Sequence, residues 1–143
     1  MSVELPFAPV DSVLRRNAGD LRIGRDATEE LAERIQTRGG ALATEAAERA
    51  AGDGRKTLMA KDFDVEDVPD TGEVELPIAP VDRIARLEID DRYRVSMDAR
   101  VTLAAILEEF ADDVARNAGT LARHADRRTV KSEDVETYLE LRD

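Results

Sequence analysis

ARHADRRTVKSED, residues 122–134, combines a helix end, a basic turn and a new helix start. His124 closes a long amphipathic segment, and the turn that follows places three positive charges around Thr129. Ser132 followed by two acidic residues is typical of a helix N-terminus, because acidic side chains there offset the helix dipole. A basic loop between two helices favours the binding of phosphate groups.

A weaker copy of this stretch, GRKTLMAKD, occupies residues 54–62. It repeats the basic triplet 72 residues earlier, as Arg55, Lys56 and Thr57 for Arg127, Arg128 and Thr129. ELPFAP at residues 4–9 likewise recurs as ELPIAP at residues 75–80, 71 residues later. The chain therefore contains a duplicated unit.

The composition favours helices. Hydrophobic residues make up 42% of the 143 residues and aromatic residues only 3%, with no Trp, which suits helices packed through small aliphatic side chains. The chain has no Cys and one His, which argues against a disulfide framework, a metal site or a cofactor. No apolar run approaches the ~20 residues of a membrane span, so we expect a soluble, intracellular, all-α protein.

The charge balance argues against a polyanion as partner. With 32 acidic and 21 basic residues, the net charge of −11 repels nucleic acid at long range. Only three basic residues are lysines, and we interpret this acidic, arginine-rich composition as that of a protein from a very salty cytoplasm. At ~1 M salt the Debye length is about 3 Å, so local arginines can still decide binding. The same salt weakens phosphate contacts through the counterion effect.

The longest predicted helix runs from the N-cap Ser96 to about His124. One stripe of it is apolar: Leu103, Leu107, Phe110, Val114 and Leu121. The opposite side carries Glu108, Glu109, Asp112, Asp113 and Arg116. One face of this helix must therefore be buried.

The corresponding helix of the first copy has a thinner stripe, interrupted by Gly39 and Gly40. Each mid-helix glycine costs about 1 kcal/mol relative to alanine. Two interpretations stay open: a weakened helix in a diverging copy, or a close approach at Gly39 where two long helices cross.

Shorter elements complete each copy. Pro9 and Pro80 lie where a first helix starts, with Val10, Val13 and Leu14 or Val81, Ile84 and Leu87 as its inner positions. First loops are predicted at residues 20–24 and 91–96, and final helices at residues 60–68 and 132–141. The predicted units are residues 1–68 and 75–143, joined by a linker at residues 69–74.

Together these motifs resemble the archaeal histone family, in a tandem form of halophilic type. The second half matches that family from ELPIAPVDRIAR through RVSMDARVTLAAILEEFADDVA to LARHADRRTVKSEDVE, and the first half keeps the same frame with substitutions. The resemblance covers nearly the whole chain. It implies two tandem histone folds that pair head to tail as an intramolecular pseudodimer, since one unit of about 65 residues cannot enclose a core alone.

The resemblance also implies a set of DNA-binding residues. The first loop of one half would lie beside the second loop of the other, with Arg22 next to Thr129 and Arg94 next to Thr57. In the family such an arginine enters the DNA minor groove, the threonine orients it, and the loop cations contact phosphates. The candidates are Arg22, Arg94, Lys56, Arg128, Thr57 and Thr129, with Arg55, Arg127, Lys131 and Arg83 in supporting positions.

Family contacts between dimers imply a second surface, formed here by Leu121, His124 and Asp134. The first half has Arg49 and Gly52 in place of the leucine and the histidine, so we expect self-association through the second half only. A family pair that anchors the last helix is matched by Arg100 and Asp134. Thr28 replaces this arginine in the first half.

Two functions follow as hypotheses. The first is an architectural chromatin protein that binds double-stranded DNA with low sequence specificity. The second is a histone-fold transcription regulator that acts through protein contacts and binds DNA weakly, which the acidic composition favours. Without the duplication, the loop arginines would be interpreted as solvated turn residues paired with Asp20, Asp126 or Glu133.

Other chemistry has little support in the sequence. The acidic run DFDVED at residues 62–67 lacks the spacing of a calcium loop, and no nucleophile and base pair stands out. We expect no enzyme, no small-molecule substrate, and a cytoplasmic, chromosome-associated protein.

Overall fold

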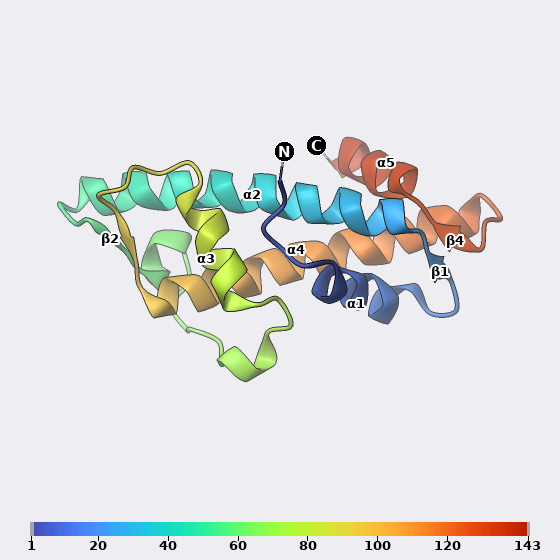
Figure 1. Ribbon diagram of the computed structural model, residues 1–143, viewed down its shortest axis with the longest axis horizontal. Coiled ribbons are helices and arrows are strands. Elements are labelled where there is room, and N and C mark those ends of the chain that lie inside the picture. Colours follow the sequence, from blue (N-terminus) through green and yellow to red (C-terminus); the bar gives the residue numbers. More distant parts are fainter. Residues whose placement is uncertain (1, 143) are drawn as a thin grey trace.

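The computed structural model describes residues 2–142, and these residues are predominantly helical (Figure 1). The first half contains α1 (Phe7–Ala18), β1 (Arg22–Ile23), α2 (Arg25–Gly52), β2 (Thr57–Leu58) and the 3-10 turn η1 (Ala60–Phe63). The second half contains α3 (Ile78–Arg86), β3 (Arg94–Val95), α4 (Met97–His124), β4 (Thr129–Val130) and α5 (Ser132–Arg142), after a linker with the 3-10 turn η2 (Thr71–Glu73). The predicted order of elements is therefore present in both halves, with one exception in η1.

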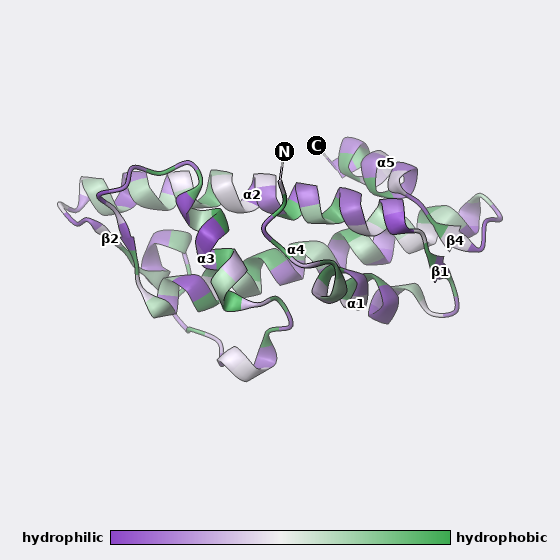
Figure 2. Ribbon diagram, viewed as in Figure 1, coloured by the Kyte–Doolittle hydropathy of each residue, from purple (hydrophilic) through white to green (hydrophobic). Residues whose placement is uncertain are grey.

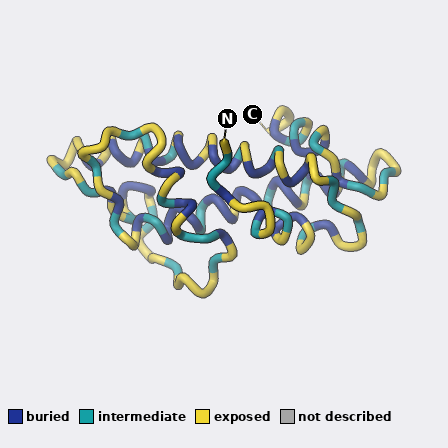
Figure 3. The backbone as a smooth tube through the Cα atoms, in the orientation of Figure 1, coloured by how far each residue is buried: buried dark blue, intermediate teal, exposed yellow. Residues whose placement is uncertain are grey.

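The two long helices α2 and α4 form the centre of the molecule, and the shorter helices pack on them (Figure 1). Hydrophobic and buried residues recur along both long helices, while exposed residues concentrate in the end loops and the linker (Figures 2 and 3). Leu31 and Ile35 of α2 join Leu103 and Leu107 of α4 in one core, all at 0% exposure. Because both halves contribute to this core, neither half encloses it alone.

Gly39 lies where side chains of α3 and α4 pack closely against α2. A Cβ atom at this position would lie 2.6 Å from Cγ2 of Ile84 on α3 and 3.1 Å from Cδ1 of Leu107 on α4. The helix α2 continues through it without interruption from Arg25 to Gly52. The structure therefore favours the close-approach interpretation of this glycine.

Two side chains lie on the opposite side from the one predicted. Glu108 is 9% exposed, and its carboxylate accepts hydrogen bonds from the main-chain N–H groups of Glu75 (2.6 Å) and Leu76 (2.9 Å). It is buried because the segment before α3 packs on the side of α4 that was expected to face water. Leu87 is 50% exposed, since α3 ends at Arg86 and the chain turns away there.

The final helix predicted for residues 60–68 was too long. Only the four residues of η1 are helical, and Asp64 takes a left-handed conformation (φ 60°). Tyr138 and Leu139, which pack α5 against the core, correspond at the 72-residue spacing to Glu66 and Asp67. Without an apolar inner face, and with acidic residues where a helix C-terminus disfavours them, the helix does not continue.

The loops of the two halves pair crosswise at opposite ends of the molecule. β1 runs parallel to β4 with Arg22 opposite Thr129, and β2 runs parallel to β3 with Thr57 opposite Arg94. Each of these strand pairs joins one half of the chain to the other.

Candidate nucleic-acid interface

At one end, which we call the Arg22 end, main-chain bonds fix the first loop of the first half to the second loop of the second half. The N–H of Arg22 donates to the carbonyl of Arg128 (2.8 Å), and the N–H of Gly24 donates to the carbonyl of Val130 (2.9 Å). The Arg22 side chain is exposed, and its partner Thr129 is half-buried. The arginine therefore projects from a rigid main-chain pair.

The opposite end, the Arg94 end, repeats this arrangement. The N–H of Arg94 donates to the carbonyl of Lys56 (2.8 Å), and the N–H of Ser96 donates to the carbonyl of Leu58 (3.1 Å). Arg94 is exposed and Thr57 is half-buried. Both predicted pairs, Arg22 with Thr129 and Arg94 with Thr57, are thus neighbours in space.

Cations without an acidic partner gather at these two ends. Eight of the 21 basic residues form no ion pair within residues 2–142. Six of the eight belong to the two loop contacts: Arg22, Arg128 and Lys131 at one end, and Arg94, Lys56 and Lys61 at the other. Lys61 was not among the predicted residues, although its place four residues after Thr57 could have indicated it; it lies in η1, directly after the second loop. The remaining two are Arg38 and Arg123.

Arg55 and Arg127, predicted as supporting DNA contacts, are held by buried carboxylates. Arg127 binds both oxygens of Asp134, with Nη1 at 2.7 Å from Oδ2, and Arg55 binds Asp62 at 2.7 and 2.9 Å. The hydrogen bonds from Arg55 hold the pKa of Asp62 below its ordinary value, and those to Asp134 raise the pKa of Arg127. These two arginines anchor their loops.

The same carboxylates also fix the main chain after each strand. Asp62 accepts a hydrogen bond from the N–H of Met59, and Asp134 accepts one from the N–H of Lys131, both at 2.8 Å. Asp62 and Asp134 are each 2% exposed. Each second loop is therefore clamped by one arginine and one aspartate.

The predicted pair of Arg100 with Asp134 is not formed. Arg100 binds Asp82 instead (3.1 Å). Arg100 lies at the start of α4 and Asp134 beyond its end, and 24 residues of helix between positions 100 and 124 span about 36 Å. The first half also keeps an anchor, through Arg55, where Thr28 had suggested a loss.

The other predicted residues fall outside the loop contacts. Arg83 is exposed and binds Glu4 (3.2 Å) across the two halves. Leu121 is half-buried and His124 is exposed near the end of α4, while Asp134 is occupied within the chain. In the first half, Arg49 binds the carbonyl of Asp62 (2.6 Å) and the carboxylate of Asp64 (3.2 Å).

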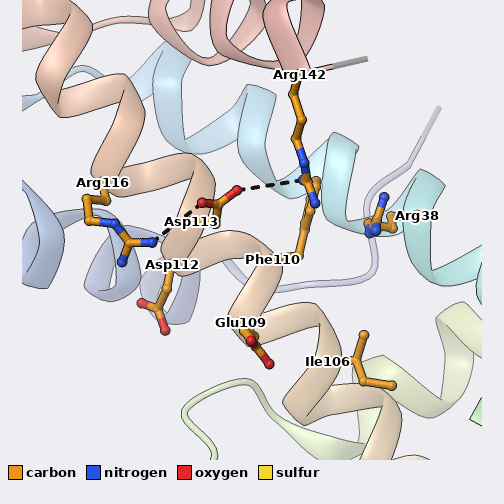
Figure 4. Close-up of a pocket in the computed structure, with 8 residues that line it drawn as sticks. All are labelled: Arg38, Ile106, Glu109, Phe110, Asp112, Asp113, Arg116 and Arg142. Atoms are coloured by element: carbon orange, nitrogen blue, oxygen red, sulfur yellow. Dashed lines mark hydrogen bonds and ion pairs between the residues drawn. The ribbon is translucent and has the colours of Figure 1, made fainter. Parts of the chain in front are cut away.

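A cavity of ≈630 Å³ is lined mainly by side chains of α4, with Arg38 of α2 and Arg142 of α5 (Figure 4). The guanidinium carbons of Arg38 and Arg142 lie 4.7 and 5.3 Å from the ring centre of Phe110, and Asp113 binds Arg116 and Arg142. The lining residues are Arg38, Ile106, Glu109, Phe110, Asp112, Asp113, Arg116 and Arg142. This set contains neither a nucleophile with a base nor an arginine cluster free of acids.

Residues 2–142 contain neither a metal-binding cluster nor a membrane-spanning helix. No group of three or more His, Cys, Asp or Glu side chains in this range is arranged to hold a metal ion. None of the described helices combines the length and apolar character that crossing a bilayer requires.

Sequence comparison places both halves in one family. The model of the family described as histone-like transcription factor (CBF/NF-Y) and archaeal histone matches residues 3–65 and again residues 74–139. The chain belongs to this family. Its members have the histone fold, and they are generally non-enzymatic, DNA-binding and chromatin-associated proteins.

Individual archaeal histones resemble about half of the chain. A subunit of the archaeal histone HAN1 of Thermococcus zilligii is 54% identical over 61 residues, which are 43% of this chain and 88% of that protein. A probable archaeal histone 3 of Methanocaldococcus jannaschii is 48% identical over 65 residues, which are 46% of this chain and 94% of that protein.

Solved structures match the chain over nearly its full length. The histone from Methanopyrus kandleri superposes with a TM-score of 0.71 at 26% identity, covering 92% of this chain and 91% of that one. A protein of Thermus thermophilus superposes with a TM-score of 0.70 over 94% of this chain and 93% of its own, and at 17% identity it supports the fold alone.

Proposed function

We propose that this histone-family chain binds duplex DNA with low sequence specificity. It does so as an intramolecular pseudodimer whose two ends, the Arg22 end and the Arg94 end, both contact the duplex. Its two histone folds are residues 1–68 and 75–143, joined by the linker at residues 69–74. The observation that carries the proposal is the gathering of six free cations at the two crossed loop contacts. In a chain of net charge −11, this placement favours an anionic partner at those two places.

The spacing of the two ends suits a duplex. The 28 residues of α4 separate the two loop contacts by about 42 Å. One turn of DNA rises about 34–36 Å, so successive minor grooves that face the protein recur at a similar distance. Arginines inserted into such grooves hold and bend a duplex without reading its base sequence.

Each residue of a loop contact has a separate role in this proposal. Arg22 and Arg94 enter the minor groove, and the adjacent Thr129 and Thr57 orient them. The remaining free cations of the loops contact phosphates, namely Lys56, Lys61, Arg128 and Lys131. Arg55 and Arg127 hold the loops in place through Asp62 and Asp134.

The acidic, lysine-poor composition supports an origin in concentrated salt. At ~1 M salt the repulsion between the acidic surface and a polyanion extends only about 3 Å. Contacts at the loops then decide binding, and the rest of the surface contributes little to it.

The test is the double variant Arg22→Ala/Arg94→Ala, titrated with duplexes of several sequences. We expect affinity to fall at least about tenfold on every sequence, because each groove contact is lost regardless of the bases. The control is Arg34→Ala/Arg116→Ala, which removes the same charge from ion-paired positions on α2 and α4. Equal affinities for the two variants would contradict the proposal.

A second candidate, a regulator that acts through protein contacts, is favoured by the second-half surface. Leu141 is 73% exposed there, and a cavity of ≈300 Å³ is lined by Asn117, Thr120, Leu121, Tyr138, Leu141 and Arg142. We propose that two chains join through this surface and His124 and then stop, since such a contact between identical surfaces closes on itself.

The mass of the particle in solution tests this assembly. The native chain should form a two-chain particle, and Leu121→Arg/His124→Ala should be a single chain. Long filaments of the native chain, or a two-chain particle that survives the double change, would contradict it. A two-chain particle that binds no duplex would favour the regulator over the DNA-binding function.

A further inference from the structure

The two loop contacts differ in side chains that occupy equivalent places. At the 72-residue spacing, Lys131 and Arg25 of the Arg22 end correspond to Met59 and Met97 of the Arg94 end. Met59 is 42% exposed and Met97 is 57% exposed. One end therefore has two cations where the other has two exposed apolar side chains.

The two methionines flank the strand pair that carries Arg94. Met59 follows Leu58, whose carbonyl accepts the hydrogen bond from Ser96, and Met97 follows Ser96. The carboxylate of Asp62 fixes the main-chain N–H of Met59, and the capping bond from Ala99 to the Ser96 hydroxyl fixes the first turn at Met97. Met59 and Met97 therefore lie two and three residues beyond the paired Thr57 and Arg94, on a main chain that these hydrogen bonds fix.

Neither methionine is needed to close the core at this end. Leu58 (0% exposed) and Val95 (3%) fill it beneath the strand pair, whereas Met59 and Met97 are among the exposed large hydrophobic side chains of residues 2–142. Exposed thioethers beside a set of free cations have an unfavourable contact with water that a partner can relieve. The partner of the adjacent cations is the natural candidate.

We infer that Met59 and Met97 form an apolar clamp on DNA, packing against the deoxyribose rings that line the minor groove next to Arg94. This inference rests on the proposed DNA-binding function. Methionine is flexible enough to fit an irregular groove wall, and proteins that bind the minor groove use methionine among their apolar contacts. The Arg22 end, with Lys131 at the matching place, holds DNA through charge.

The clamp makes the two ends respond differently to salt. Phosphate contacts lose affinity steeply as salt rises, because they depend on counterion release. Burial of apolar surface does not weaken in potassium chloride in this way. The Arg94 end therefore keeps more of its hold on DNA in concentrated salt than the Arg22 end does.

The test compares Met59→Gln/Met97→Gln with Lys131→Gln in duplex titrations between about 0.2 and about 1 M potassium chloride. Glutamine nearly preserves the shape of methionine and removes its apolar end. We expect the methionine variant to lose about tenfold in affinity at every salt concentration. The Lys131→Gln variant should lose affinity mainly at low salt and little at high salt. The slope of its affinity against salt concentration should be smaller than that of the native chain.

A reciprocal change sharpens the result. Met59→Lys should increase the salt slope of binding by about one ion, because it adds a phosphate contact where the clamp was. Circular dichroism of each variant shows whether the helices are intact.

The outcomes separate the clamp from the function on which it rests. If the methionine variant binds as the native chain does while Arg22→Ala/Arg94→Ala binds weakly, the clamp is wrong and the DNA-binding function stands. A methionine variant that changes only the mass in solution would likewise overturn the clamp. If the arginine variant also binds as the native chain does, both proposals are wrong.

Discussion

The second loops of the two halves take part in equivalent loop contacts, but the chain continues differently after each of them. In the second half, β4 leads into the eleven residues of α5, which pack on both long helices. In the first half, β2 leads into the four residues of η1 and then into the linker. Yet the strand pairs at the two ends have equivalent registers, and the anchors Arg55–Asp62 and Arg127–Asp134 have the same geometry. The loop contact at the Arg94 end thus forms without a full terminal helix after its second loop.

The largest effect should come from separating the halves. Residues 1–68 expressed alone should be unfolded, because their core side chains and both strands need the second half. Residues 75–143 alone should self-pair, since α5 supplies an additional apolar face. Circular dichroism and solution mass measure both outcomes, and mixing the two pieces should restore helicity. A stably folded monomer of residues 1–68 would refute the shared core.

The anchors should matter equally at the two ends. Asp62→Asn and Asp134→Asn should each reduce the free energy of unfolding by about 2 kcal/mol, because each removes the buried carboxylate of the anchor and leaves the arginine only an exposed acidic partner, Asp53 or Glu133. Urea titration measures this. A much smaller effect in the first half would mean that η1 has made its anchor redundant.

Gly39 should tolerate no side chain, in contrast to its neighbour. Gly39→Ala should destabilise the protein by about 2 kcal/mol, since its Cβ would overlap the fully buried Ile84. Gly40→Ala should stabilise α2 by about 1 kcal/mol, because its Cβ would meet only the exposed Glu88 side chain, at 3.4 Å. Equal shifts in melting temperature for the two variants would contradict the close approach.

The helix α4 has a side-chain N-cap and α2 has none, so substitutions at the two helix starts should change stability differently. Ser96→Ala should cost about 1 kcal/mol, because the hydroxyl accepts the hydrogen bond from the Ala99 N–H. The equivalent residue is Gly24, where Ser should bring no gain, since a Cβ would lie 2.5 Å from Asp26 Oδ1 and 3.0 Å from the Val130 carbonyl. A stabilised Gly24→Ser variant would show that the Arg22 end is looser than the structure indicates.

The smallest expected effect is the contribution of the first-half anchor to the loss of stability in acid. Arg55 lowers the pKa of Asp62 in the folded chain, so this carboxylate contributes stability above its unfolded pKa near ~3.9. That contribution is lost as the pH falls through the lower folded pKa. Asp62→Asn should therefore lose less stability than the native chain on acidification. The slope that remains has other sources, such as Asp26, whose pKa the Ser132 N–H lowers. Identical slopes in the two proteins would contradict the anchor.

The features that the sequence predicted correctly are those that follow from the repeated motifs or from the residue types within one segment. The duplicated motifs predicted the order of elements, and the helix limits at Ser96 and His124 agree with α4. The neighbours of Arg22 and Arg94 followed from the family resemblance and lie where that resemblance implied. These features depend on local patterns or on a shared frame.

The errors have two sources, tertiary packing and analogy. Glu108 has the periodicity of an exposed residue, and only the path of the segment before α3 buries it. The anchor of Asp134 was assigned to Arg100 by analogy, although Arg127 is closer both in the sequence and in space. The helix predicted for residues 60–68 ends at Phe63, since Glu66 and Asp67 stand where α5 has apolar residues and Pro69 follows.

The strand pairs also set an order of folding during synthesis. β2 and β3 join residues 37 positions apart, Thr57 and Arg94, so this contact can close once α3 and the start of α4 have left the ribosome. β1 and β4 join Arg22 to Thr129, 107 positions apart, so the first strand to be made waits until the chain has been made through α4 and β4. Contacts between distant residues form slowly, and an unpaired segment is open to aggregation meanwhile. The newborn chain therefore closes from its middle outward, and its N-terminal helix is the part that most needs protection.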